Sequence, residues 1–145
     1  MPVTGRRFLL DTNVVSEMAK TSPDPQVANW LSTQHSICVS SVTLFELSAG
    51  IEQLRSGRRR EFLQAWIAEL LADIVEVVPF DQEAALTASR LQAQGRASGR
   101  SIELRDLFIL ATAGAAGLTV ATRNVDHFAG FGVPVLDPFA GVRAL

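Results

Sequence analysis

Short apolar runs alternate along the chain with longer segments in which apolar residues recur every three or four positions. Unbroken apolar runs of this length are typical of strands that are buried on both faces of a sheet. The runs cover residues 8–10, 37–39, 74–78, 118–121 and 133–136. We therefore expect about five buried strands.

The segments between these runs have the spacing of amphipathic helices. Helices are expected over residues 14–20, 27–34, 42–54, 60–71, 82–93 and 103–116. Strands that alternate with helices indicate an α/β fold with a mostly parallel central sheet flanked by helices. A length of 145 residues suits one domain, so we expect residues 1–145 to form a single unit.

Three polar stretches interrupt this pattern. Pro23-Asp24-Pro25 separates the first two helices, and residues 56–60 form a basic turn between two later ones. Residues 94–101 combine glycine, serine and arginine, and a mobile loop is expected there.

Composition limits the class of protein. A hydrophobic fraction of 48% with 19% charged residues describes a globular chain with enough material for a core. The net charge of −2 provides no general attraction to nucleic acid, so a nucleic-acid surface would have to be local. The single cysteine, Cys38, excludes an intrachain disulfide and suits a reducing compartment. The apolar run after Arg7 stops at Asp11, too early for a signal peptide or a membrane span, and we expect a cytoplasmic protein.

Asp11 ends the first apolar run, at the edge of the sheet where ligands bind in open α/β folds. Its alternative role is to cap the helix that follows. Asn13 can cap equally well, which favours a functional role for Asp11.

Two further acids lie on apolar helices. Glu46 has small or apolar neighbours one helical turn away and no cation among them, although a solvated position at a helix edge is the alternative. Asp106 is flanked by Ile102, Ile109 and Leu110 at helical spacing, and an acid buried there must be paired or bound to metal. Arg105 is adjacent and is expected to point elsewhere. The alternative is a buried salt bridge to another arginine.

The fourth strand ends in polar residues, again at the expected ligand edge. Thr122, Asn124 and Asp126 can each face the site, although Asn and Asp are also ordinary turn residues.

Carboxylates that converge in a medium of low dielectric constant repel one another and need a positive group between them. The chain has no CxxC or HxxxH pattern and only two histidines, which argues against zinc. Ligation by oxygen alone points to Mg²⁺ or Mn²⁺, and such ions suit phosphodiester hydrolysis.

Five segments together resemble the PIN-domain ribonucleases, specifically the VapC-type toxins of type II toxin–antitoxin pairs. They span nearly the whole chain in the family's order: residues 8–17, 40–47, 104–113, 121–124 and 132–139. The resemblance implies a PIN-like fold and a metal-dependent endoribonuclease that uses Mg²⁺ or Mn²⁺ to activate water.

The same resemblance assigns Asp11, Glu46 and Asp106 to catalysis and metal binding. Family members often have a fourth acid, whose place Asn124 takes here; either Asp126 replaces it or Asn124 binds a water molecule of the metal. Thr12, Asn13, Thr122 and Asn124 are expected to orient the carboxylates. Phosphates of the RNA substrate are expected to contact Arg96, Arg100 and Arg123 and the basic turn, with residues 94–101 as a clamp.

The resemblance also implies a homodimer and a small cognate antitoxin that inserts a basic side chain into the acidic pocket. An apolar groove for the antitoxin is expected on the first two helices. The alternative is that the same residues are core: Val14, Val15, Met18, Val27 and Trp30.

Three alternatives to an RNA nuclease remain open from the sequence. A non-catalytic PIN-like binding module would explain Asn124 but not the three retained acids. A haloacid-dehalogenase-like phosphatase would need a second Asp at the position of Asn13, and would form an aspartyl-phosphate. Cleavage of DNA or of structured flaps would use the same acids.

Overall fold

The central sheet has five parallel strands in the order β3-β2-β1-β4-β5. The computed structural model describes residues 6–141, apart from the side chains of residues 73 and 74. The strands are β1 (Phe8–Leu10), β2 (Ile37–Ser40), β3 (Val75–Val78), β4 (Thr119–Ala121) and β5 (Val135–Leu136). The α/β fold with a parallel sheet, expected from the sequence, is confirmed.

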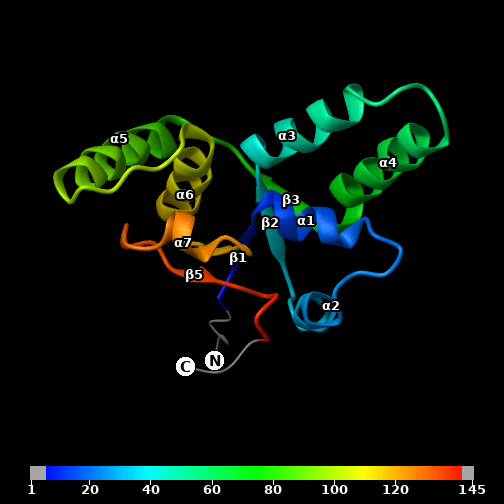
Figure 1. Cartoon of the computed structure of the whole chain (residues 1–145), viewed down its shortest axis with the longest axis horizontal. Coiled ribbons are helices and arrows are strands. Elements are labelled where there is room, and N and C mark those ends of the chain that lie inside the picture. Colours follow the sequence, from blue (N-terminus) through cyan, green and yellow to red (C-terminus); the bar gives the residue numbers. More distant parts are fainter. Residues whose placement is uncertain (1–5, 142–145) are drawn as a thin grey trace.

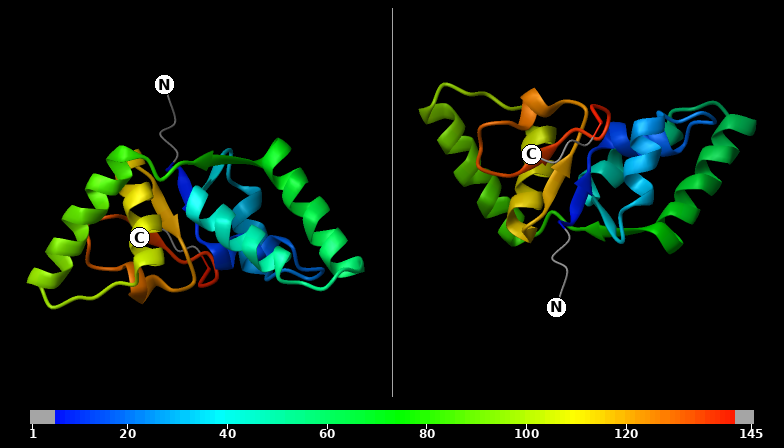
Figure 2. Two further views of the ribbon diagram at one scale, coloured as in Figure 1. Left: turned by 90° about the horizontal axis from the view of Figure 1, so that it is seen from above. Right: turned by 90° about the horizontal axis from the view of Figure 1, so that it is seen from below.

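Helices cover both faces of this sheet. They are α1 (Thr12–Met18), α2 (Pro25–Ser32), α3 (Ser41–Glu52), α4 (Arg58–Glu69), the π-helical η1 (Leu70–Ile74), α5 (Gln82–Ala97), α6 (Leu104–Ala116) and α7 (Val125–Phe128). In Figure 1 and in both views of Figure 2, α5 and α6 lie on one side of the sheet and α3 and α4 on the other. Within residues 6–141, no helix combines the length and apolar character needed to cross a bilayer.

Alternate residues of the strands supply two separate cores. Leu9 and Val120 pack with α5, α6 and Phe128 of α7. Phe8 and Leu10 face the opposite way and pack with the cluster that contains Val14, Val27 and Trp30. A parallel strand buried on both faces needs apolar residues at consecutive positions, which explains the unbroken runs in the sequence.

Side chains at the strand ends start the helices. Ser40 accepts a hydrogen bond from the backbone N–H of Thr43 at the start of α3, and Asp81 caps α5 in the same way. Asp24 caps α2, with Pro25 in the first helical position, so the breaker between the first two helices is confirmed. Gly117 ends α6 with a left-handed conformation (φ +70°), which glycine adopts without strain.

The strand order creates a topological switch point beside β1. The chain proceeds from β1 outward to β2 and β3, and then returns to place β4 on the other side of β1. Ligands of open α/β sheets bind beyond the carboxyl ends of the strands at such a point. Asp11 directly follows β1 and Thr122 directly follows β4, so both lie there.

The prediction of a mobile loop over residues 94–101 is wrong for the first half of that segment. Residues 94–97 form the last turn of α5. Gly95 is buried, and a β-carbon there would lie 2.9 Å from the ring of Phe131 and 2.9 Å from the carbonyl oxygen of Arg100. Glycine is therefore present for close packing rather than for flexibility.

Two further expectations are corrected by the packing. Val14, Val15, Val27 and Trp30 are core residues, so they do not form an open groove for a partner. The polar segment after β4 contains a short helix, α7, which is not among the helices expected from the sequence. The buried ring of Phe128 anchors it.

Candidate active site

Asp11 is held by four hydrogen bonds at the carboxyl end of β1. Its Oδ1 atom accepts from the backbone N–H of Thr12 at 2.8 Å, which caps α1. Its Oδ2 atom accepts from the Thr122 hydroxyl at 2.8 Å and from the Asn13 amide at 3.4 Å. The Arg105 guanidinium donates to Oδ1 at 2.9 Å. The capping role considered for Asp11 is therefore confirmed, while its functional role stays a prediction, to which its place in a charged cluster is relevant.

Arg105 lies between the three acids that the sequence singles out. Its Nη2 atom contacts Asp11, its Nε atom contacts Glu46, and its Nη1 atom contacts Asp106. The expectation that Arg105 points away from Asp106, and that Glu46 has no cation, is wrong. The neighbours of Glu46 on its own helix do not reveal a cation that reaches it from another helix. The long side chain of Arg105 can also fold back along its own helix to contact Asp106.

A chain of hydroxyl groups orients Glu46. Thr12 donates to its Oε1 atom at 2.7 Å and accepts from Arg105 at 3.0 Å. Thr43 is fully buried beside Thr12, with a separation of 3.4 Å between the two hydroxyl oxygens, and Ser40 contacts Thr43 in turn. These contacts leave Glu46 little freedom to rotate.

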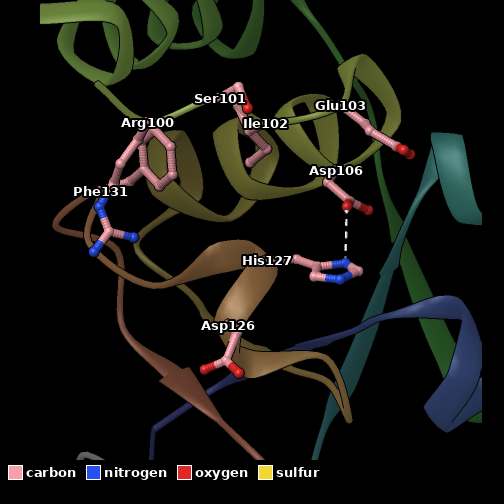
Figure 3. Close-up of a pocket in the computed structure, with 8 residues that line it drawn as sticks. All are labelled: Arg100, Ser101, Ile102, Glu103, Asp106, Asp126, His127 and Phe131. Atoms are coloured by element: carbon pink, nitrogen blue, oxygen red, sulfur yellow. Dashed lines mark ion pairs between the residues drawn. The ribbon is translucent and has the colours of Figure 1, made fainter. Parts of the chain in front are cut away.

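Asp106 lies in the first turn of α6, where the helix dipole favours a negative charge. Burial nevertheless raises the pKa of its carboxyl group, and the positive charge of Arg105 opposes part of that rise. Its Oδ2 atom lies 3.5 Å from Nδ1 of His127 on α7. Figure 3 shows the imidazole turned towards this carboxylate.

A pocket of about 320 Å³ opens beside Asp106. It is lined by Arg100, Ser101, Ile102, Glu103, Asp106, Asp126, His127 and Phe131. Asp126, one of the two candidates for the role of the fourth acid, lines this pocket, but in Figure 3 its carboxylate points away from Asp106 while His127 points towards it. Asn124 is exposed at the start of α7 and contributes its backbone N–H, which donates to the Thr122 hydroxyl at 3.0 Å.

The arginines expected to hold phosphates have different surroundings. Arg100 lines the pocket and donates to the carbonyl oxygen of Ala129 at 2.7 Å. Arg123 follows Thr122, and its guanidinium carbon lies 3.8 Å from the centre of the Phe139 ring. Arg96 is exposed on α5, and Arg60 of the basic turn pairs with Glu52. Their contact with RNA stays a prediction.

The sequence reading missed four residues at this site. Arg105 was set aside, and His127, Ser40 and Thr43 were not considered. For Ser40 and Thr43 the sequence does contain a signal. Ser40 follows a predicted strand, where a serine is an ordinary helix cap, and the end of that strand is also the edge of the sheet at which ligands bind. For His127 the only signal was its place in the polar segment after β4.

The donor set suits a hard divalent cation, because the converging atoms are carboxylate oxygens. One oxygen of each acid already contacts the same positive group, the Arg105 guanidinium. Within residues 6–141, however, no three His, Cys, Asp or Glu side chains are already arranged to hold a metal ion. The fit to a cation therefore rests on the chemistry of the three carboxylates and not on a preformed set of ligands.

Comparison with known proteins identifies the family of this fold. The PIN-domain family model matches residues 8–132. The VapC ribonuclease Y4jK of Sinorhizobium fredii is 36% identical, over 91% of this chain and 97% of its own. The tRNA(fMet)-specific endonuclease VapC of Salmonella typhimurium is 30% identical, over 84% and 89% of the two chains. The crystal structure of FitAcB from Neisseria gonorrhoeae superposes with a TM-score of 0.79 and 30% identity, over 91% and 98%.

Proposed function

The chain belongs to the PIN-domain family, among the VapC-type toxins, and on that premise we propose that it is a metal-dependent endoribonuclease. The observation that carries the proposal is the convergence of Asp11, Glu46 and Asp106 on one positively charged point at the switch point of the sheet. The family membership removes the support for a haloacid-dehalogenase-like phosphatase.

Asp11 and Asp106 are the proposed direct ligands of Mg²⁺ or Mn²⁺. Both side chains are almost fully buried, at 1% and 7% exposure, so their positions are set by the fold. A bound divalent cation supplies Lewis acidity at the phosphate and makes water a stronger nucleophile. Glu46, at 27% exposure, completes the ligand set or orients the attacking water.

The remaining side chains act by positioning. Thr122 and Asn13 hold one oxygen of Asp11, which leaves the other directed at the centre of the cluster. Thr12 does the same for Glu46. Carboxylates fixed in this way need no reorganisation when charge develops on the phosphate, which is the condition for effective electrostatic stabilisation.

The RNA is proposed to enter over the pocket beside Asp106. This pocket adjoins an acid of the cluster and contains Arg100 and His127, which can contact a phosphate or ribose next to the bond that is cut. One of the similar proteins is named for cleavage of a transfer RNA, so transfer RNA is the first substrate class to test.

A cleavage assay on purified, antitoxin-free protein tests the proposal. Transfer RNA and total RNA are incubated with Mg²⁺, with Mn²⁺ or with EDTA. Cleavage should require the metal and fall by at least about 100-fold in Asp11→Asn and Asp106→Asn, more than loss of an indirect contact costs. Glu46→Gln should reduce it as well.

The matched control is Glu83→Gln, an exposed acid in the first turn of α5, which should leave cleavage unchanged. Cleavage that survives both aspartate substitutions would refute the assigned site. Folded protein that binds Mn²⁺ but cuts none of these RNAs, nor single-stranded or flap DNA, would favour the non-catalytic binding module.

We also propose that the chain is a homodimer and pairs with a small antitoxin, as membership of the VapC-type toxins suggests. The first two helices are excluded as an open groove, because their apolar side chains are core. Among exposed large apolar residues, Phe45 on α3 and Phe62 on α4 are candidates for the docking surface. Failure to form a stable complex with the product of an adjacent small gene would contradict the pairing, and light scattering tests the dimer.

A further inference from the structure

The centre of the acidic cluster is filled by a side chain of the protein itself. Arg105, the second residue of α6, reaches acids on three different elements: Asp11 after β1, Glu46 on α3 and Asp106 on its own helix. Each of the three guanidinium nitrogens contacts a different carboxylate. The fork geometry of arginine allows this, whereas a lysine presents a single charged atom.

The charges of the four residues explain why the arrangement is stable. Three carboxylates that meet in a partly buried site repel one another strongly. The guanidinium lowers this repulsion and satisfies one oxygen of each acid. Burial alone would lower the pKa of Arg105, but its hydrogen bond to Glu46 and the negative charge of Asp11 raise it above the ordinary arginine value. An arginine side chain keeps its positive charge in proteins, so Arg105 is a cation within the cluster.

A divalent cation and this guanidinium would compete for the same carboxylate oxygens. Mg²⁺ or Mn²⁺ would need carboxylate oxygens within about 2.2 Å, and these are oxygens to which Arg105 now donates. The two positive groups would also repel each other. Arg105 can leave the cluster, because its side chain is 32% exposed to solvent and the contacts to be broken are polar ones, to the three acids and to Thr12.

We propose that Arg105 is a built-in competitor of the metal, which holds the three carboxylates together in the metal-free protein and must be displaced when the cation binds. This inference rests on the proposed metal site and adds a regulatory element to it. Displacement of Arg105 would raise the dissociation constant for the metal by a factor set by the strength of the Arg105 contacts.

The test is calorimetric titration of the full chain with Mn²⁺ at fixed ionic strength, which requires no RNA and no catalysis. Arg105→Met removes the charge and keeps much of the side-chain length. Its dissociation constant for Mn²⁺ should be at least about tenfold smaller than that of the wild type, since close charge pairs couple by more than about 1.4 kcal/mol. The matched control, Arg7→Met, removes the same charge before β1 and should change the constant by less than about twofold.

Two variants separate failure of this inference from failure of the metal site. If Asp11→Asn and Asp106→Asn bind Mn²⁺ as well as the wild type does, the proposed metal site itself is wrong. If they weaken binding while Arg105→Met binds Mn²⁺ no more tightly than the wild type, the metal site stands and the competition by Arg105 is refuted.

Folding of Arg105→Met is followed by circular dichroism with EDTA and with Mn²⁺. A variant that folds only with Mn²⁺ supports the inference, because the cation then replaces the missing guanidinium. If the variant folds under neither condition, Arg105→Lys takes its place in the titration. The lysine ammonium cannot contact all three acids in the arginine geometry, so Mn²⁺ binding should again be tighter than in the wild type, and equal or weaker binding would overturn the proposal.

Discussion

Two arginines form ion pairs near the two ends of β1, and the surroundings of these ion pairs differ. Arg7 directly precedes the strand and contacts Glu76 of β3, with both side chains largely exposed, at 49% and 63%. Arg105 contacts three acids beyond the end of the strand, two of which are almost fully buried. Both sites use a guanidinium group, but water screens the charges of the Arg7 pair and is largely excluded from the Arg105 cluster.

This difference shows what burial does to a charged contact. An exposed pair contributes little, because water solvates its members almost as well when they are apart. In a buried cluster, removal of one partner leaves charges that neither water nor protein compensates. A cluster of acids that needs a compensating positive charge can take that charge from a cation, which is why the Arg105 cluster, and not the Arg7 pair, is the candidate site.

The largest effect on stability is expected from substitution of Arg105, with Arg7 as its exposed counterpart. Without metal, Arg105→Met should lower the free energy of unfolding by about 2–3 kcal/mol, reduced from the value for a fully buried pair because a third of the side chain is exposed. Arg7→Met should lower it by less than about 1 kcal/mol. Urea unfolding in EDTA measures both variants, and equal losses would remove the distinction between the two clusters.

Thr122→Val tests the contacts that hold Asp11 in place. The Thr122 hydroxyl is fully buried and donates to Asp11 while it accepts from the backbone N–H of Asn124. Loss of this hydroxyl should lower the free energy of unfolding by about 1–3 kcal/mol, because buried polar atoms lose their hydrogen-bond partner. Metal affinity or cleavage should fall by about 10- to 100-fold.

Thr112→Val is the matched control for that experiment. Thr112 is also buried, but its hydroxyl donates only to the carbonyl oxygen of Phe108 within α6. This variant should keep full metal affinity and cleavage. If the two threonine variants lose activity equally, Thr122 acts through general stability and not through Asp11.

Glu17 offers a smaller, pH-dependent effect in a third ion pair. Its carboxylate accepts from Lys20 at 2.9 Å and from the backbone N–H of Asp24 at 2.8 Å, and these contacts lower its pKa. A folded-state pKa below the unfolded value contributes stability above the unfolded pKa, which is about 4.3 for a glutamate, and the contribution is lost as the pH falls through the folded value.

Glu17→Gln should therefore be less stable than the wild type at pH 7, and the difference should shrink as the pH falls below about 4.3. Urea unfolding of both proteins from pH 7 down to pH 3 measures this difference. A difference that stays constant across that range would mean that the loss comes from packing and not from the charge of Glu17.

Much of the fold could be predicted from the sequence. Each strand begins at or within two residues of an expected apolar run, and each acid of the cluster stands out as a charge among apolar neighbours. The resemblance to the PIN-domain family could also be recognised from the sequence, and the match of the family model confirms it. The boundary of α5 was less predictable, because glycine and serine suggest a loop unless the packing of Gly95 against Phe131 is known.

The sequence by itself determined which segments become strands and helices, because hydrophobic periodicity and capping act between residues a few positions apart. It also determined that three carboxylates follow or flank buried segments and need a positive partner. Only the tertiary structure decided which partner that is. Arg105 meets Glu46 across 59 positions of sequence and Asp11 across 94, and contacts at such separations depend on the order of the strands and the packing of the helices.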